Sequence, residues 1–199
     1  EPRFRPPFPP SKGLWGKPTA IHNVETLMNV PQIVLHGAQW FNSIGTAQSK
    51  GTKVVSVSGD VQNPGIYEVP MGTPLRELVE DLARAQDIRF VQVGGASGRL
   101  VAAERLDVPL AFEGVLGAGA VIVFSSDRDV VEVARETISF FVEESCGKCT
   151  PCRQGTKALL EILCRLSAGC GSADDLTKLQ DLAEHMALAS LCGLGQAAP

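Results

Sequence analysis

Three of the six cysteines stand in the run Cys146-Gly147-Lys148-Cys149-Thr150-Pro151-Cys152-Arg153, and a fourth, Cys192, follows well downstream. Thiols at this C-x2-C-x2-C spacing cannot sensibly bond one another, but they can converge on one metal cluster that the remote thiol closes. A cubane iron–sulfur cluster takes four Cys thiolates as its ligands. The spacing therefore predicts a [4Fe–4S] cluster held by Cys146, Cys149, Cys152 and Cys192.

Zinc and disulfide bonds are the competing uses of these cysteines. A four-cysteine zinc site is usually built from two separated C-x2-C pairs, so the third cysteine of the run would be superfluous for zinc. Disulfide frameworks belong to short secreted chains with dense cysteine, whereas six cysteines in 199 residues is an ordinary content. Structural zinc remains the alternative to the iron–sulfur cluster.

The other two cysteines do not keep the C-x2-C rhythm. Cys164 lies in an apolar run, where we expect a buried free thiol, and Cys170 lies in a glycine-rich loop, where it is either buried or an exposed reactive thiol. His185, near the fourth ligand, is expected in an exposed or supporting role rather than as a ligand.

The residues between the cysteines suit an anionic cluster. Gly147 permits a tight backbone turn, and Pro151 can open a helix, since the N–H that proline lacks would be unpaired in the first turn. The N-terminal dipole of such a helix, with Lys148 and Arg153, would offset part of the negative charge of the cluster.

Composition narrows the class of protein. The 199 residues are 44% apolar and 20% charged, with a net charge of -4, which is typical of a globular protein without a nucleic-acid-binding surface. No apolar run approaches the roughly 18 residues of a membrane span. Reduced thiol ligands favour a cytoplasmic setting. Glu1 and the proline-rich opening indicate the middle of a longer chain.

Three zones can be predicted, the first of which is residues 1–50. It begins with a proline-rich extended segment, of a kind that wraps a surface more often than it forms a core. Apolar residues at Leu27, Val30, Ile33 and Val34 then give one helical stripe that ends near Gly37. This zone has too little apolar surface to fold alone.

The second zone, residues 51–126, is predicted as a small mixed module. Strands are expected at 53–58, where β-branched residues alternate, at 66–69, after a turn signal, at 90–93, and at 120–124, which is strongly apolar. Pro74 opens a helix after the first hairpin, with Thr73 as its N-cap. A hairpin, a helix and further strands make the order of a β-grasp. Gly94-Gly95-Ala96-Ser97-Gly98 lacks the spacing of a phosphate-binding loop and is predicted as a turn.

The third zone, residues 127–199, is predicted to be helical. Apolar stripes mark one helix before Cys146 and another after Cys152, and Ser172 caps a third helix. The apolar face of that third helix is expected to consist of Leu176, Leu179, Leu182, Ala183 and Met186. An antiparallel bundle would return Cys192 to the three-cysteine loop.

Several segments of the sequence resemble a known family. The segment 144–153 and the segment Cys192-Gly193-Leu194-Gly195-Gln196 look like the flavin-bearing, NADH-oxidising subunit of respiratory complex I and its relatives, the diaphorase subunit of NAD-reducing hydrogenases and the β subunit of NAD-dependent formate dehydrogenases. Gly13-Leu14-Trp15-Gly16-Lys17-Pro18-Thr19, Asn23-Val24-Glu25-Thr26-Leu27 and Val57-Ser58-Gly59-Asp60-Val61 agree with it. The resemblance runs over nearly the whole chain.

The resemblance implies a fold and cofactors. The family combines a ubiquitin-like, ligand-binding β-grasp with a helical domain that holds a [4Fe–4S] cluster, so the expected class is α+β, preceded by the tail of a flavin domain. FMN and NAD(H) bind upstream of the region present here. Asn23, and with it His22 where relatives have a second Asn, would lie near the FMN phosphate. Asn23 also suits the N-cap of the helix that follows.

The implied function is electron transfer within an NAD(H)-dependent oxidoreductase. Flavin takes a hydride from NADH, and the cluster passes electrons singly to the iron–sulfur subunits of a larger complex, of the complex I, hydrogenase or formate dehydrogenase type. No nucleic acid and no direct membrane span are expected. The region alone is expected to be inactive. The alternative is a non-catalytic β-grasp and helical scaffold with structural zinc.

Overall fold

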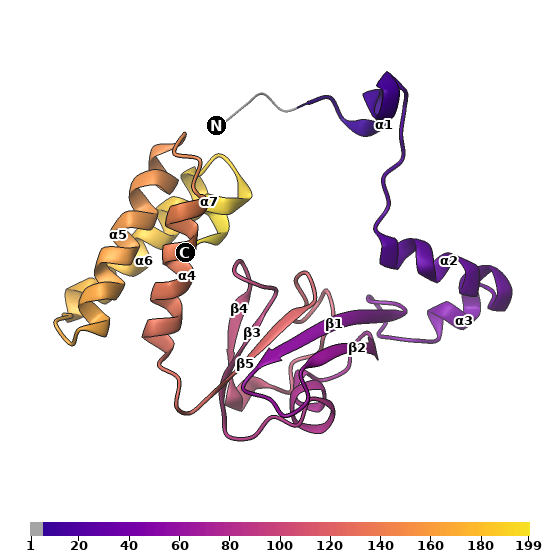
Figure 1. The fold of residues 1–199 in the computed structure, drawn as a ribbon, viewed down its shortest axis with the longest axis horizontal. Helices are drawn as coiled ribbons and strands as arrows, with labels where there is room; N and C mark the ends of the chain where they lie inside the picture. Colours follow the sequence, from indigo (N-terminus) through magenta and orange to yellow (C-terminus); the bar gives the residue numbers. More distant parts are fainter. Residues whose placement is uncertain (1–5) are drawn as a thin grey trace.

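The computed structural model describes residues 6–199 as a helical arm, a five-stranded sheet and a second group of helices (Figure 1). The strands are β1 (Thr52–Gly59), β2 (Gly65–Pro70), β3 (Ile88–Val93), β4 (Arg99–Ala102) and β5 (Ala120–Ser125). The α-helices are α1 (Pro9–Lys12), α2 (Val24–His36), α3 (Ala38–Asn42), α4 (Val130–Glu144), α5 (Thr150–Ser167), α6 (Ala173–Ala189) and α7 (Gly193–Ala197). Short turns of other helix types are η1 (Leu14–Gly16), η2 (Glu77–Leu82) and η3 (Ala103–Arg105).

The sheet has the strand order β2-β1-β5-β3-β4. β1 pairs with β5 in parallel, and every other neighbouring pair is antiparallel. The four strands predicted from the sequence are confirmed. Sequence reasoning missed β4, because only Val101 of its four residues is buried and so little apolar alternation marks it.

One face of the sheet and the helix beside it enclose the main core. Its fully buried members include residues of β1, β3, β5 and the segment around η2, namely Val55, Leu75, Leu78, Val79, Val91 and Val123. The predicted helix after Pro74 is present, but its last turns have π-type hydrogen bonding over Glu77–Leu82. The prediction of Thr73 as its N-cap is wrong, since the Thr73 hydroxyl donates instead to the carbonyl oxygen of Pro70, 2.8 Å away.

The segment from Gly94 to Gly98 is the turn between β3 and β4, as predicted. Gly94 and Gly95 have φ angles of 104° and 74°, a region that favours glycine. The N–H of Gly98 donates to the carbonyl oxygen of Gly95 over 2.8 Å and closes the turn.

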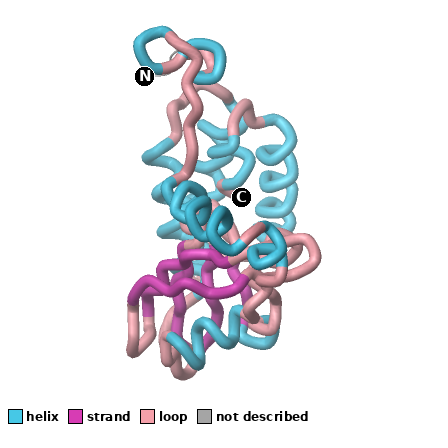
Figure 2. The backbone as a smooth tube through the Cα atoms, turned by 90° about the vertical axis from the view of Figure 1, so that its right-hand side faces the viewer, coloured by secondary structure: helices cyan, strands magenta, loops and turns pink. Residues whose placement is uncertain are grey.

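The helices α4 to α7 pack together beyond one end of the sheet (Figure 2). Their core consists mainly of Ile138, Phe141, Leu159, Leu163 and Met186. Ser172 and Asp175 form a reciprocal capping box at the start of α6, which confirms the predicted cap.

Two burial predictions in this group of helices are wrong. Cys164 is exposed, because the buried positions in the C-terminal half of α5 are Leu159, Ile162 and Leu163 and residue 164 lies outside that stripe. Leu176 is also exposed, since the neighbouring Asp175, which pairs with Arg165 of α5, takes the buried position in the first turn of α6. Cys170 is an exposed thiol.

The junction between the sheet and α4 is fixed by Asp60. Its carboxylate accepts hydrogen bonds from the backbone N–H and the hydroxyl of Ser125, over 3.0 and 2.9 Å, at the end of β5. The same carboxylate pairs with Arg128 through Nε and Nη2, over 3.0 and 2.9 Å. Asp60 therefore joins the last residue of β5 to the segment that begins α4.

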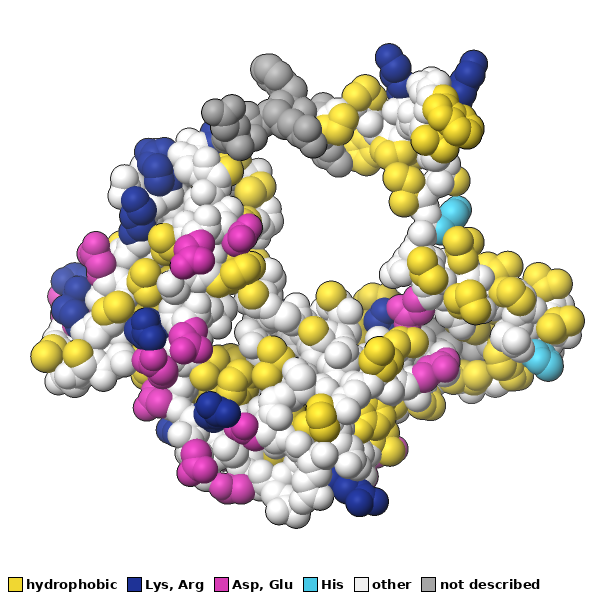
Figure 3. All heavy atoms as spheres, viewed as in Figure 1, with side chains coloured by type: hydrophobic (Ala, Val, Ile, Leu, Met, Phe, Trp, Pro, Cys, Tyr) yellow, Lys and Arg dark blue, Asp and Glu magenta, His cyan; other side chains and the backbone are white. Residues whose placement is uncertain are grey.

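The arm contributes almost nothing to a core. None of the described residues 6–48 is buried. α2 exposes apolar side chains along its length, and the space-filling view shows apolar surface spread over the arm (Figure 3). These exposed residues of α2 are Val24, Leu27, Met28, Val30, Val34 and Leu35. The prediction that this zone cannot bury enough surface by itself is confirmed.

Candidate metal centre

The first three predicted ligands lie where α4 gives way to α5. Ser145 is the C-cap residue of α4, and Cys146 follows it. Cys149 is the N-cap residue of α5, and Cys152 lies in the first turn of that helix. Burial increases along the series, because Cys146 is exposed, Cys149 half-buried and Cys152 buried.

Arg153 holds this loop in place. Its Nη1 donates to the carbonyl oxygen of Gly147 over 2.6 Å, and its Nη2 reaches the hydroxyl of Thr150 at 3.3 Å. Gly147 has a φ angle of 74°, so a residue with a side chain would be strained there. The loop turns back on α5 because the sequence supplies a glycine at the turn and an arginine in the helix that follows.

The fourth predicted ligand enters from the other end of the group of helices. Cys192 is the N-cap residue of α7, just after α6 ends. α7 packs so closely against α5 that a Cβ built on Gly195 would lie 2.8 Å from Cβ of Cys152. A backbone without a side chain is therefore required at Gly195 for the Cys192 segment to approach the three-cysteine loop.

Electrostatics at Cys149 favour the thiolate. The backbone N–H of Leu191, the residue before Cys192, lowers the pKa of the Cys149 thiol, and the N–H of Cys152 and the charge of Arg153 act in the same direction. A hydrogen bond to the charged form of a group stabilises that form. The thiolate is also the form that ligates metal. The Leu191 contact joins the two cysteine segments directly.

Two hydroxyl groups lie beside the buried ligand. Ser145 Oγ is 3.3 Å from Sγ of Cys152. Ser190 Oγ would lie 2.5 Å from the Cβ built on Gly195, the same point that is close to Cβ of Cys152. Within residues 6–199, Ser190 Oγ is the only buried side-chain nitrogen or oxygen atom that lacks a hydrogen-bond partner. Sequence reasoning missed both serines, although Ser145 directly precedes Cys146.

The structure thus brings the two cysteine segments close to each other, but the four thiols do not converge on one point. No three His, Cys, Asp or Glu side chains among residues 6–199 are grouped tightly enough to hold a single metal ion as they stand. The residues fit an anionic iron–sulfur group, because a thiol with a lowered pKa, a nearby arginine and an unpaired buried hydroxyl surround the same place.

The helix α2, which begins directly after His22 and Asn23, lies across the molecule from α5 and its cysteines (Figure 1). Asn23 is the N-cap of α2, as predicted, and its Oδ1 accepts from the N–H of Glu25 over 3.2 Å. His22 is an exposed residue of the preceding segment. Their contact with FMN remains a prediction.

The motif around Asn23 has a structural role that sequence reasoning missed. Glu25 pairs with Lys53 of β1, and its other oxygen accepts from the N–H of Val54 over 2.9 Å. Burial alone would raise the pKa of Glu25, but the hydrogen bonds from Lys53 and Val54 lower it overall. Glu25 therefore ties α2 to the sheet.

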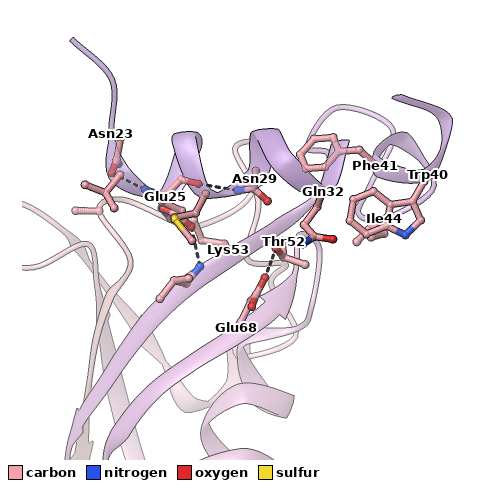
Figure 4. A pocket seen from close by; sticks show the side chains of 14 residues that line it. Asn23, Glu25, Asn29, Gln32, Trp40, Phe41, Ile44, Thr52, Lys53 and Glu68 are labelled. Atoms are coloured by element: carbon pink, nitrogen blue, oxygen red, sulfur yellow. Dashed lines mark hydrogen bonds and ion pairs between the residues drawn. The ribbon is translucent and has the colours of Figure 1, made fainter. Parts of the chain in front are cut away.

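A pocket of about 660 Å³ lies between α2–α3 and the β1–β2 edge of the sheet (Figure 4). Glu25 and Lys53 meet at one end of it, and Trp40, Phe41 and Ile44 cover the other end (Figure 4). Its walls combine amide, charged and aromatic side chains.

Two known family models match parts of the chain, one in the helical region and one in the sheet module. The family described as the NADH-ubiquinone oxidoreductase-F iron-sulfur binding region matches residues 132–199, which contain all four predicted ligands. The SLBB domain matches residues 54–97, within the sheet module. Residues 132–199 are therefore similar to the iron–sulfur binding region of NADH-ubiquinone oxidoreductase-F proteins. The resemblance expected from the sequence is confirmed over this region.

Two curated proteins align with the whole chain. The NADP-reducing hydrogenase subunit HndC of Solidesulfovibrio fructosivorans is 45% identical over 209 residues, which cover 100% of this chain and 43% of the relative. A subunit of the NADH-quinone oxidoreductase of Mycobacterium bovis is 44% identical over 207 residues, which cover 100% of this chain and 46% of the relative. The chain therefore spans less than half the length of these two relatives.

A solved structure has the same fold. In the crystal structure of an NAD+-reducing [NiFe]-hydrogenase in the H2-reduced state, one chain matches with a TM-score of 0.87 and 44% sequence identity. The match covers 100% of this chain and 35% of the hydrogenase chain. Among residues 6–199, no helix combines the length and apolar character that a membrane crossing requires.

Proposed function

We propose that this chain is the electron-transfer portion of an NAD(H)-dependent flavoprotein subunit. It passes electrons between FMN and the iron–sulfur centres of other subunits through a [4Fe–4S] cluster held by Cys146, Cys149, Cys152 and Cys192. When bound, the cluster supplies one-electron chemistry, which separates the electron pair taken by a flavin into single steps.

The observation that carries this proposal is the approach of the Cys192 segment to the three-cysteine loop. The Leu191 N–H acts on the Cys149 thiol, and the Gly195 backbone lies against Cys152. A fourth ligand far along the chain is useful only where the fold returns it to the first three. The match of the iron–sulfur binding region over residues 132–199 supports the same ligand set.

The residues of this chain would bind and orient the cluster. Arg153 fixes the loop between Cys146 and Cys149, Gly195 permits the approach of Cys192, and the burial of Cys152 shields one side of the cluster from water. Exposed Cys146 and Cys192 would lie on the outer side, toward a partner protein.

We propose the same three zones that the sequence predicts. Residues 51–126 form a β-grasp module, supported by the strand order with parallel central strands. Residues 127–199 form a helical bundle that holds the cluster. Residues 1–50 are the tail of a flavin domain, supported by the lack of burial over 6–48 and the exposed apolar side chains of α2. That domain would cover α2 in the whole subunit.

The relatives indicate the cofactors and partners of the whole subunit. HndC is a subunit of an NADP-reducing hydrogenase, and the mycobacterial relative is a subunit of an NADH-quinone oxidoreductase. We therefore propose FMN and NAD(H) as cofactors of the complete subunit, with His22 and Asn23 near FMN, and iron–sulfur subunits of a larger complex as partners. A reducing, cytoplasmic compartment would keep the thiol ligands available.

Iron content and electron paramagnetic resonance of the complete subunit test the ligand set. Replacement of Cys146, Cys149, Cys152 or Cys192 by Ser is expected to remove the signal of the reduced cluster and the corresponding iron. Cys164→Ser and Cys170→Ser are matched controls, because both thiols are exposed and lie outside the site. These two variants should keep the full iron content.

Two results would contradict the proposal. A full iron complement in Cys192→Ser would show that the remote ligand is assigned wrongly. Zinc in place of iron after anaerobic purification, without the visible absorbance of an iron–sulfur cluster, would favour the structural-zinc scaffold.

A further inference from the structure

Ser190 carries a hydroxyl that the protein leaves unpaired. The residue is 5% exposed, and its Oγ has no hydrogen-bond partner among residues 6–199. Its backbone is fully engaged, because its N–H donates to the carbonyl oxygen of Met186 over 3.1 Å and its own carbonyl oxygen accepts from Nε2 of Gln196 over 3.0 Å. A buried hydroxyl without a partner costs free energy, and native proteins rarely retain one.

The unpaired hydroxyl lies beside the most buried of the predicted cluster ligands. A single point, the Cβ built on Gly195, is 2.5 Å from Ser190 Oγ and 2.8 Å from Cβ of Cys152. No side chain occupies that point, because residue 195 is glycine. Ser190 therefore lies next to the Cys152 side chain without bonding to its sulfur.

A second hydroxyl lies on the same ligand. Ser145 Oγ is 3.3 Å from Cys152 Sγ, where either atom can donate in the thiol form. A metal-bound thiolate has no proton, so Ser145 would have to be the donor. Two O–H groups therefore lie near Cys152. That of Ser145 already contacts the sulfur, and that of Ser190 has no partner.

We propose that the Ser190 hydroxyl donates a hydrogen bond to a sulfur atom of the bound cluster at its Cys152 corner and thereby raises the cluster's reduction potential. The inference rests on the proposed [4Fe–4S] site. Reduction adds negative charge to the cluster, and a hydrogen bond donated to its sulfur stabilises the more negative state. Ser190 is a positioning residue that tunes the potential, and its Oγ is the only buried side-chain nitrogen or oxygen atom among residues 6–199 that is free to make this hydrogen bond.

A redox titration of the complete holoenzyme, followed by electron paramagnetic resonance, tests the inference. The signal of this cluster is identified as the one that Cys192→Ser removes. Ser190→Ala and Ser190→Gly both lack the hydroxyl, while Ser190→Thr keeps it. The two variants without a hydroxyl should show a more negative midpoint potential, and Ser190→Thr should stay near the wild-type value. Ser145→Ala should shift the potential in the same direction.

Ser167→Ala is the matched control, because its hydroxyl bonds Glu132 on the surface of the same group of helices. Its midpoint potential should not change. An unchanged potential in Ser190→Ala and Ser190→Gly would overturn the inference, and so would an equal shift in Ser190→Thr, since shape would then matter instead of the hydroxyl.

Loss of the cluster is also decisive. If Ala and Gly at position 190 lose iron while Thr keeps iron and the wild-type potential, the hydroxyl is required and the inference is supported. If all three variants lose iron, Ser190 acts through packing and the inference is wrong. Absence of an iron–sulfur signal from the wild-type protein would instead contradict the proposed function itself.

Discussion

Arg153 donates from Nη1 to the carbonyl oxygen of Gly147 over 2.6 Å, so a side chain in the first turn of α5 closes the loop between two predicted ligands. Hydrogen bonds that involve a charged group contribute about 1.5–3 kcal/mol. Arg153→Ala should therefore release iron roughly ten times faster than the wild type in the presence of a chelator. Loss of the visible absorbance with time measures the rate.

Lys148→Ala is the control for this prediction. It removes a neighbouring positive charge from an exposed position of the same loop. If Lys148→Ala accelerated iron loss as much as Arg153→Ala, net charge would be responsible and the proposed loop restraint would be wrong.

Replacement of Asp60 should weaken the junction between the sheet and α4. Its carboxylate accepts from Ser125 and Arg128, and the Arg128 hydrogen bonds lower the pKa of Asp60 well below its usual range. Asp60→Asn should lower the free energy of unfolding by about 1–3 kcal/mol, as expected for loss of hydrogen bonds to a charged group. Urea denaturation followed by circular dichroism measures the change. Asp81→Asn, on the exposed side of η2, should change it little.

The lowered pKa of Asp175 should make the free energy of unfolding depend on pH. The hydrogen bond from Arg165 and those from Ser172 lower the pKa of Asp175 to about 2. A carboxyl group with a lowered folded-state pKa contributes stability above its unfolded value, near 3.8, and loses that contribution as the pH falls through about 2. The wild-type apoprotein should therefore have a higher free energy of unfolding than Asp175→Asn near neutral pH, and this difference should disappear as the pH falls from about 3.8 to about 2. Urea denaturation at several pH values follows it, and a constant difference down to pH 2 would contradict the assignment.

Gly59 should tolerate no side chain. Its φ angle is 93°, and a Cβ there would lie 2.8 Å from the backbone nitrogen of Val123. Gly59→Ala combines backbone strain with a clash against a core strand, so we expect a loss of at least about 2 kcal/mol of unfolding free energy. Gly65→Ala is the matched control, since a Cβ at Gly65 meets nothing within 4 Å. Thermal unfolding compares the two variants, and equal effects would contradict the argument.

Residues 1–199 alone should not oxidise NADH. The sequence contains neither a glycine-rich dinucleotide loop nor an acidic ribose ligand at the proper spacing. The isolated region should hold a cluster, bind FMN poorly and show no NADH oxidation with ferricyanide as acceptor. Activity should appear when the upstream region is restored. Robust oxidation by these residues alone would mean that the nucleotide site lies within them.

Most elements of the fold can be predicted from the sequence, because the spacing of apolar residues indicates which side of a strand or helix is buried. The strands around Val55 and Val91 are short runs rich in valine, the strand around Val121 is almost entirely apolar, and all three appear where expected. β4 is not predictable in this way, because an edge strand with one buried residue leaves no alternation. The apolar neighbours of Cys164 predict a core position, but in a helix the angular position of a residue determines burial, not the composition around it.

The candidate site is predictable only in part. The C-x2-C-x2-C spacing predicts Cys146, Cys149 and Cys152 as ligands, since the ligand pattern of a cluster depends on local spacing. The contacts of Ser190 and Gly195 depend on how α7 returns to α5, and local sequence does not contain that information. Likewise, the pairing of Glu25 with Lys53, which ties α2 to the sheet, requires the three-dimensional arrangement.

The parallel pairing of β1 with β5 has a consequence for the order of events on the ribosome. β1 can form its hairpin with β2 soon after synthesis, but its other neighbour is made only when residues 120–125 emerge. Such distant pairing slows folding, because the intervening chain must be ordered before the contact is gained. The sheet is therefore completed just before α4 is synthesised, and Cys192 emerges after the other three predicted ligands. With the proposed ligand set, cluster insertion must await the synthesis of Cys192, so a translation product that ends before this residue cannot carry a complete redox centre.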